Sequence, residues 1–143
     1  MPEDSIARQF ECVMVIDDSD TDRYIAEHYL KKNSIAAKVI SKASAMQALE
    51  YLGQYSDFIQ LPRVIFLDIR MPVMDGFDFL DEYEKLSKTV HKNCTIYMLS
   101  SSVDPSDHDR IKNNPFVKGF ISKPLNKEKL QKILLENTVA EKL

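Results

Sequence analysis

The stretch VIFLDIRMPVMDG, residues 64–76, joins a short apolar run to a carboxylate and a turn. The run at 64–67 is bulky and uninterrupted, as expected of a strand buried on both faces of a parallel sheet. Similar runs lie at residues 13–16, 37–40, 95–99 and 118–121, and the five runs start about 25–30 residues apart. This interval is close to the length of one strand–helix unit.

A segment with helical spacing of apolar residues follows each run. The expected inward positions are Ile25, Tyr29 and Lys32 with Leu30; Ala45, Leu49 and Leu52; Phe79, Leu80, Tyr83 and Leu86; Ile111; and Leu130, Ile133 and Leu134. Helix starts are expected at Ser44, at the turn Asp75-Gly76, at Asp104-Pro105 and at Asn126. Five strands alternating with five helices predict an α/β fold, a flavodoxin-like doubly wound parallel sheet in the order 2-1-3-4-5.

Length and composition favour one folded domain over residues 1–143, with a core from about 12 to 135 and short tails. Hydrophobic residues make up 44% and charged residues 29%, which excludes disorder. A net charge of −3 argues against nucleic-acid binding. The first eleven residues lack an apolar signal segment, and the longest apolar runs are too short to span a membrane. Cys12 and Cys94 are expected to be buried and reduced, in a cytoplasmic protein.

Chemically active side chains follow four of the predicted strands. The pair Asp17-Asp18 follows the first, Asp68 the third, Ser100 the fourth and Lys123 the fifth. Asp and Ser are common in loops, so each residue alone reads as a turn residue. Parallel strands, however, bring their carboxyl ends to one edge, where three carboxylates would repel one another and attract Mg²⁺. With a lysine and a hydroxyl beside them, the set suits phosphoryl transfer, with Asp68 as the nucleophile.

Two other metal motifs fit less well. Asp18, Asp20 and Asp22 alternate like the start of an EF-hand loop, but Arg23 and Tyr29 occupy the positions that need Gly and Glu. The DxDxT/V motif of dehalogenase-type phosphatases also breaks, because Asp22 stands at its fifth position. Asp20 and Asp22 are therefore expected to be first-turn acids that face the helix dipole.

Four motifs together resemble the receiver domain of two-component response regulators, the class that includes the chemotaxis response regulator. They are VIDD at 15–18, FLDIRMPVMDG at 66–76, MLSS at 98–101 and GFISKP at 119–124. The resemblance extends from about residue 12 to residue 135. It implies that Asp68 is the phosphoacceptor and that Asp17 and Asp18 hold Mg²⁺ with the Asp68 carboxylate and the backbone carbonyl of Arg70.

The resemblance also implies roles for residues around this centre. Ser100 and Lys123 are expected to contact the phosphoryl group, and Phe120 is expected to be the switch aromatic that moves when Ser100 moves. Arg70 and Ser102 occupy positions that tune dephosphorylation. The Arg70 guanidinium could reach the phosphoryl oxygens or pair with an acid, and the sequence leaves both open.

The expected function is therefore a phosphoacceptor switch rather than an enzyme. Asp68 would take a phosphoryl group from the phosphohistidine of a histidine kinase or phosphotransfer protein, with Mg²⁺ required. The face formed by the fourth helix, fifth strand and fifth helix would then control binding of a downstream protein, with the chain a monomer or weak homodimer. Two alternatives are a receiver-like adaptor that works without phosphorylation and a Mg²⁺-dependent small-molecule phosphatase.

Overall fold

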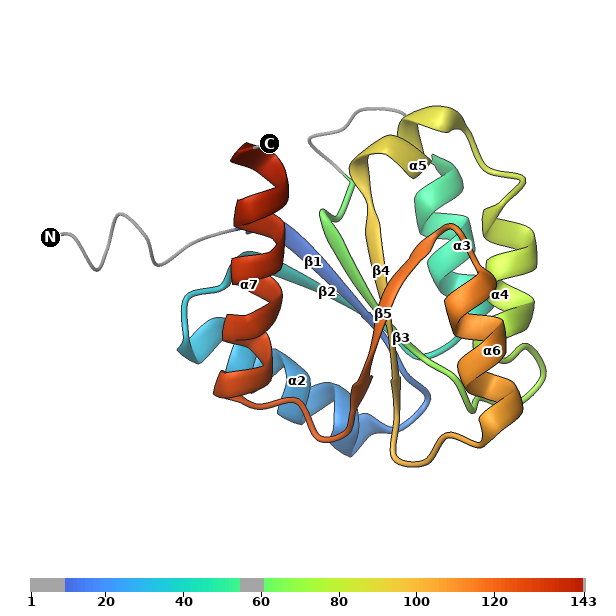
Figure 1. The fold of residues 1–143 in the computed structure, drawn as a ribbon, viewed down its shortest axis with the longest axis horizontal. Helices are drawn as coiled ribbons and strands as arrows, with labels where there is room; N and C mark the ends of the chain where they lie inside the picture. The colour runs from blue at the N-terminus through green and yellow to red at the C-terminus, as the bar shows by residue number, and fades with distance from the viewer. Residues whose placement is uncertain (1–9, 55–60, 143) are drawn as a thin grey trace, which may run out of the picture.

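A computed structural model describes residues 10–54 and 61–142, with side chains described as far as Glu136. Five parallel strands form one sheet in the order β2-β1-β3-β4-β5 (Figure 1). The strands are β1 (Phe10–Ile16), β2 (Ala36–Lys42), β3 (Val64–Asp68), β4 (Thr95–Ser100) and β5 (Val117–Ser122). The predicted sheet and its strand order are confirmed.

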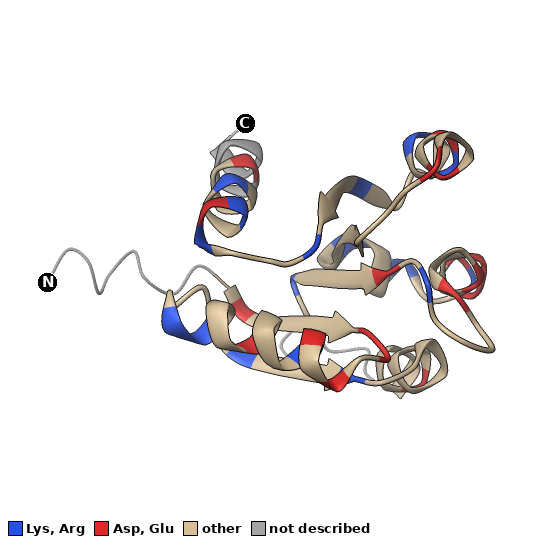
Figure 2. Cartoon of the chain, turned by 90° about the horizontal axis from the view of Figure 1, so that it is seen from below, with Lys and Arg blue, Asp and Glu red and all other residues tan. Residues whose placement is uncertain are grey.

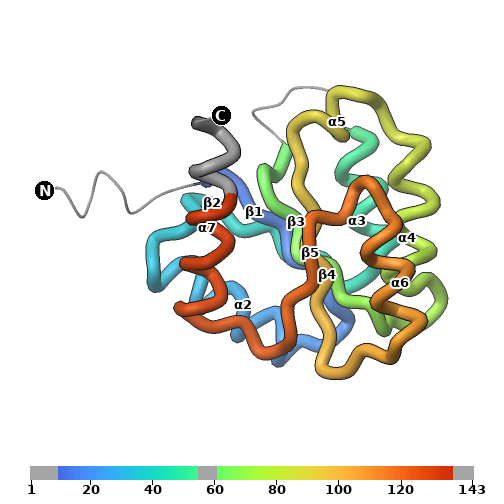
Figure 3. Tube along the Cα trace, viewed as in Figure 1, coloured from blue at the N-terminus to red at the C-terminus, as the bar shows by residue number. Residues whose placement is uncertain are grey.

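Helices cover both faces of the sheet (Figures 1 and 3). They are α2 (Asp20–Lys32), α3 (Ala45–Gln54), α4 (Gly76–Tyr83), α5 (Lys88–Asn93), α6 (Pro105–Asn113) and α7 (Lys127–Lys142). Helices α2 and α7 lie on one face, and α3, α4 and α6 lie on the other. None of the helices within the described ranges is long and apolar enough to cross a membrane.

The prediction of five helices was wrong, because residues 10–54 and 61–142 already contain six, the additional one being the short helix α5 between α4 and β4. Ser87 caps it by accepting a hydrogen bond from the Val90 N–H at 3.4 Å, and Val90 is buried against the core. Six residues with one buried apolar side chain are too few to show helical periodicity in a sequence. The helix therefore depends on its cap and on tertiary packing.

Alternate side chains of the central strand β3 pack into two hydrophobic cores, one on each face of the sheet. Val64 and Phe66 pack on the α2 and α7 side, whereas Ile65 and Leu67 pack on the side of α3, α4 and α6. All four are essentially inaccessible to solvent. Burial on both faces explains why this strand reads as an unbroken apolar run.

The inward face of α2 is displaced slightly from the predicted one. Ala26 and Leu30 are buried, whereas Ile25 and Tyr29 are only half-buried and Lys32 is exposed. A small alanine at the contact lets the helix approach the sheet, so a pattern of large apolar residues misplaces its face. The predicted buried, unpaired thiols of Cys12 and Cys94 are confirmed.

The turn before α4 brings the chain close to the end of β3. Asp75 caps the helix in a reciprocal arrangement with Asp78, and the Gly76 N–H donates to the Ile69 carbonyl at 2.9 Å. A Cβ atom on Gly76 would lie 2.7 Å from the backbone oxygen of Asp68. Only glycine allows this approach, which fixes the loop that leaves Asp68.

Candidate functional site

Three carboxylates meet at the carboxyl edge of the sheet. Ile16 of β1 pairs with Leu67 of β3, so the residues that follow them, Asp17 and Asp68, emerge side by side. Both are almost completely buried, whereas Asp18 is exposed. The three can each offer an oxygen within 4.8 Å of the others. Figure 2 shows acidic residues beyond some of the strand arrowheads and basic residues beyond others.

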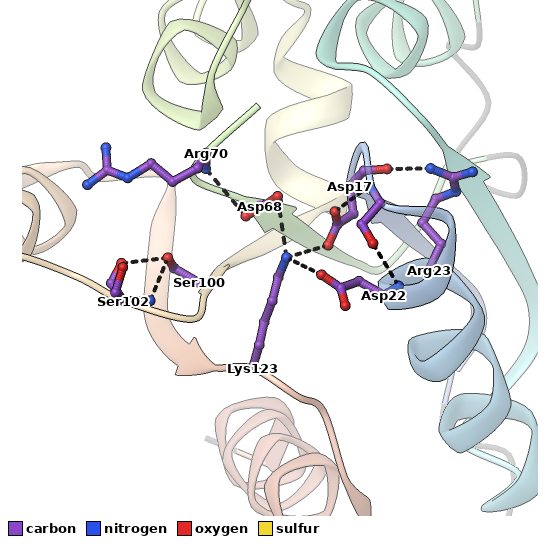
Figure 4. Close-up of polar contacts among 9 residues, drawn as sticks. Asp17, Asp22, Arg23, Asp68, Arg70, Ser100, Ser102 and Lys123 are labelled. Carbon is purple, nitrogen blue, oxygen red and sulfur yellow. Dashed lines mark hydrogen bonds and ion pairs between the residues drawn. The ribbon is translucent and has the colours of Figure 1, made fainter. Parts of the chain in front are cut away.

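Lys123 places its ammonium group among these acids (Figure 4). Its Nζ lies 2.7 Å from Asp17 Oδ2, 2.8 Å from Asp22 Oδ2 and 3.4 Å from Asp68 Oδ2. The residue follows β5, and its backbone N–H donates to the Ser100 carbonyl at 3.0 Å. The peptide bond from Lys123 to Pro124 is cis. A fixed cation thus compensates the clustered negative charge.

The electrostatics of Asp68 reflect this crowding. Burial, and after it the charge of Asp17, raise the pKa of Asp68 to about 7, even though the Lys123 ammonium and the Arg70 N–H both act to lower it. Burial alone would lower the pKa of Lys123, but hydrogen bonds with Asp17 and Asp22 and the charge of Asp68 hold it above its ordinary value. Lys123 therefore stays charged, while Asp68 takes up a proton at a higher pH than an ordinary aspartate does.

The contact between Asp22 and Lys123 was not predicted from the sequence. It was expected to act only as a first-turn acid, and that placement on α2 is correct. Its side chain, 39% exposed, also reaches the Lys123 ammonium. One signal was present in the sequence: α2 begins at Asp20, with only Ser19 between it and the pair Asp17-Asp18, so its first turn must lie at the same edge.

Ser100 lies at the end of β4 with its hydroxyl engaged inside its own loop. The hydroxyl donates to the Ser102 carbonyl at 2.6 Å and accepts from the Ser102 N–H at 3.2 Å. The half-buried ring of Phe120, on the neighbouring strand β5, meets the His108 ring of α6 edge-on, with centroids 6.0 Å apart. Ser100 thus belongs to the carboxylate edge, while Phe120 lies between the sheet and α6.

Arg70 divides its contacts between two partners. Its backbone N–H donates to Asp68 Oδ1 at 3.3 Å, while its side chain points away from Asp68 (Figure 4). The guanidinium pairs with Asp107 of α6 and lies 3.9 Å from Asp104. Of the two possibilities left open by the sequence, this structure contains the pairing with an acid.

The chain belongs to the response regulator receiver domain family, whose model matches residues 13–135. It is 32% identical over 122 residues to the sensor histidine kinase CheAY of Helicobacter pylori, covering 85% of this chain and 14% of that protein. It is 33% identical over 120 residues to Protein PilG of Pseudomonas aeruginosa, covering 82% of this chain and 80% of PilG.

A crystal structure agrees with this assignment. A response regulator receiver protein from Dyadobacter fermentans superposes with a TM-score of 0.78 at 31% identity, covering 88% of this chain and 96% of that one. Receiver domains are phosphoacceptor switches rather than enzymes in the usual sense. They generally bind Mg²⁺ at an acidic pocket, and the oxygen donors of Asp17, Asp18 and Asp68 fit that ion.

Proposed function

We propose that this chain is a phosphorylation switch in which Asp68 accepts a phosphoryl group from the phosphohistidine of a histidine kinase or phosphotransfer protein. The observation that supports this most directly is the arrangement around Asp68. Its buried carboxylate stands beside Asp17 and within 3.4 Å of the Lys123 ammonium, at the open edge of the sheet. The matching relatives include a histidine kinase, which agrees with such a donor.

In the proposed reaction a carboxylate oxygen of Asp68 attacks phosphorus. A P–O bond forms, the P–N bond of the phosphohistidine breaks, and the imidazole nitrogen keeps the electron pair and later takes a proton. Water attacks the acyl phosphate in the reverse half of the cycle, releasing inorganic phosphate and restoring the carboxylate. The products are the same protein and free phosphate, so the chain acts on itself only.

The residues around Asp68 have separate tasks in this scheme. Asp17, Asp18, the Asp68 carboxylate and the Arg70 carbonyl would hold Mg²⁺, which when bound neutralises phosphoryl oxygens. Lys123 would turn from the carboxylates to donate to another phosphoryl oxygen. Because attack needs an ionised carboxylate, the Lys123 charge also helps by lowering the pKa of Asp68 against the effect of burial.

Ser100 and Phe120 would pass the change to the surface. The Ser100 hydroxyl would leave the Ser102 carbonyl for a phosphoryl oxygen, which would move the loop between β4 and α6. Ser102 would influence hydrolysis because it holds the Ser100 hydroxyl in the resting protein. Phe120 has no hydroxyl, so packing alone would stabilise its shifted position.

The face formed by α6, β5 and α7 is the proposed contact for a downstream protein. A groove of about 370 Å³ lies between β5 and α7 on this face. Its lining residues include Phe120, Lys118 and Lys132, together with Tyr97, which donates to Glu136 at 3.1 Å. Phe120 contributes to this groove and its ring contacts His108 of α6, so its movement would affect this face.

Intact mass tests the proposal. The protein is incubated with acetyl phosphate, with Mg²⁺ or with EDTA, as wild type, Asp68→Asn and the exposed control Asp81→Asn. We expect one added phosphoryl group in wild type and in Asp81→Asn, only with Mg²⁺, and none in Asp68→Asn. Labelling of Asp68→Asn equal to that of wild type would overturn Asp68 as the acceptor. No labelling of wild type under any condition would overturn the switch and favour the adaptor alternative.

A further inference from the structure

An ion pair links the loop after Asp68 to helix α6. The Arg70 guanidinium, two residues beyond Asp68, pairs with the carboxylate of Asp107 in the first turn of α6. The two residues come from different strand–helix units, 37 positions apart. Nothing in the proposed chemistry of Asp68 requires this contact, which joins the site to the helix that adjoins Phe120.

The two partners differ sharply in exposure. The Asp107 side chain is 4% exposed, whereas 53% of the Arg70 side chain is exposed. Among the described residues, the other recorded donor to the Asp107 carboxylate is the Asp104 N–H, at 3.4 Å. A buried carboxylate that loses its cation is strongly unfavourable. If Arg70 leaves, the first turn of α6 must therefore rearrange to hydrate Asp107.

Arg70 is also the charged side chain best placed to respond to Asp68. Its backbone N–H already contacts the Asp68 carboxylate at 3.3 Å, so the base of the side chain is fixed beside the acceptor. A phosphoryl group would add close to two negative charges and three acceptor oxygens there. A guanidinium matches phosphate oxygens with two parallel hydrogen bonds, and about half of the Arg70 side chain already faces solvent.

The far side of α6 connects this ion pair to Phe120. His108 directly follows Asp107, and its ring meets the Phe120 ring edge-on. The rest of the helix is held separately, by buried Ile111 and by the Arg110 guanidinium stacked 3.7 Å from the centre of the Phe77 ring. Release of Asp107 would therefore loosen the first turn of α6 while its last turn stays packed.

We propose that Asp107 is a positioning residue for the switch: it holds the Arg70 guanidinium away from Asp68 in the resting protein and gives it up to the phosphoryl group. Phosphorylation would then break the Arg70–Asp107 ion pair and change the contact between His108 and Phe120. This route to the α6 surface is separate from the movement of Ser100, and it rests on the proposed function of Asp68.

A double-mutant cycle measured in two states tests this proposal. The variants are Arg70→Gln, Asp107→Asn and the double variant, with Asp109→Asn as a control that removes the same charge from an exposed position of α6. Each is studied with Mg²⁺ alone and with Mg²⁺ plus beryllofluoride, a stable mimic of a phosphoryl group on a carboxylate. The measured quantity is hydrogen-exchange protection of the Asp107 and His108 amides, which donate to Asp104 at 2.9 and 3.2 Å.

Without beryllofluoride, we expect the protection factor of these amides to fall at least threefold in each single variant. The double variant should show no larger fall than either single variant. With beryllofluoride, wild type should fall to the level of Arg70→Gln, and the coupling between the two positions should vanish. Asp109→Asn should behave as wild type in both states, and Arg70→Lys should recover only part of the response because it lacks the forked geometry.

A purely structural ion pair would give the same coupling in both states, and that result would overturn the proposal. The proposal would also be overturned if beryllofluoride changed the protection of the Ile69 amide but not that of the α6 amides. That result would leave the proposed function intact. If no amide near Asp68 responds in wild type, the proposed function itself fails, and this inference fails with it.

Discussion

Asp22 and Lys123 lie 101 positions apart in the chain, yet their charged groups are 2.8 Å from each other. The contact fastens the loop after β5 to the first turn of α2, across the edge of the sheet where the carboxylates gather. It also gives Lys123 a partner outside the Asp17, Asp18 and Asp68 set. The ammonium can therefore stay anchored to α2 when the other acids are engaged elsewhere.

Replacement of Asp22 measures the strength of this anchor. Asp22→Asn should lower the free energy of unfolding by about 0.5–1 kcal/mol in low salt, as expected for a partly exposed ion pair. The difference should shrink in 1 M NaCl as screening increases. Asp20→Asn is the control, since Asp20 is 93% exposed in its ion pair with Arg23 and should cost less. Urea unfolding measures these differences. If Asp22→Asn were more stable than wild type, repulsion of Asp22 by Asp17 and Asp18 would outweigh its attraction to Lys123.

The raised pKa of Asp68 predicts an unusual pH dependence. Between about pH 4 and pH 7 the folded protein keeps a proton on Asp68 that the unfolded chain loses, so stability falls as pH rises through this window. Asp68→Asn should remove this loss and exceed wild type at pH 8 by at least about 1 kcal/mol, because one pKa unit corresponds to about 1.4 kcal/mol. Urea unfolding in EDTA at pH 5, 6, 7 and 8 measures the difference. Parallel curves for the two proteins would contradict it.

Two glycines should respond oppositely to alanine. In Gly76→Ala the new methyl group would lie 2.7 Å from the Asp68 backbone oxygen and 2.9 Å from Met98 Cε, so β3 would have to shift. We expect a loss of about 1–3 kcal/mol, typical of overpacking. Gly53 lies in helix α3, and among the described residues a Cβ there would meet only Leu86 Cδ2, at 4.0 Å, so Gly53→Ala should gain up to about 1 kcal/mol from helix propensity. Thermal unfolding of both variants tests this, and a neutral Gly76→Ala would show that the turn can relax.

Val73, in the loop before α4, has a strained backbone conformation. Its φ of 70° is in the left-handed region, which a β-branched residue adopts at a cost, and its side chain is 96% exposed. Val73→Gly should therefore raise the unfolding free energy by about 1 kcal/mol without loss of packing. Val73→Ala, which keeps a Cβ, serves as the control and should gain less. Equal stability of all three proteins in urea would argue against strain at this position.

The fold was predictable because each strand contains a short apolar run and four strand ends carry a chemically active side chain. Parallel strands must bring Asp17, Asp68, Ser100 and Lys123 to one edge, so adjacency along the sheet follows from strand order alone. The extra helix α5 was not predictable from periodicity, since Val90 is its one buried residue. Local signals too short to repeat become visible only once the core has formed around them.

Side-chain partners were harder to predict than side-chain neighbourhoods. The Arg70 guanidinium pairs with Asp107 because of where α6 begins relative to the loop after β3. No local sequence pattern specifies that position. Likewise, the approach of Asp22 to Lys123 depends on the packing of two loops. Long charged side chains have many rotamers of similar energy, and the surrounding structure selects among them.

The buried thiols of Cys12 and Cys94 make the protein suitable for site-specific labelling. Burial raises the pKa of Cys94 to about 12, despite a hydrogen bond from Tyr83 that lowers it, and burial also raises the pKa of Cys12. Neither thiol forms appreciable thiolate at neutral pH, so alkylating dyes should spare both. The sequence also contains no tryptophan. A cysteine introduced on the exposed side of α6 would therefore be the reactive site for a dye, and a tryptophan introduced there would be the single indole in the chain.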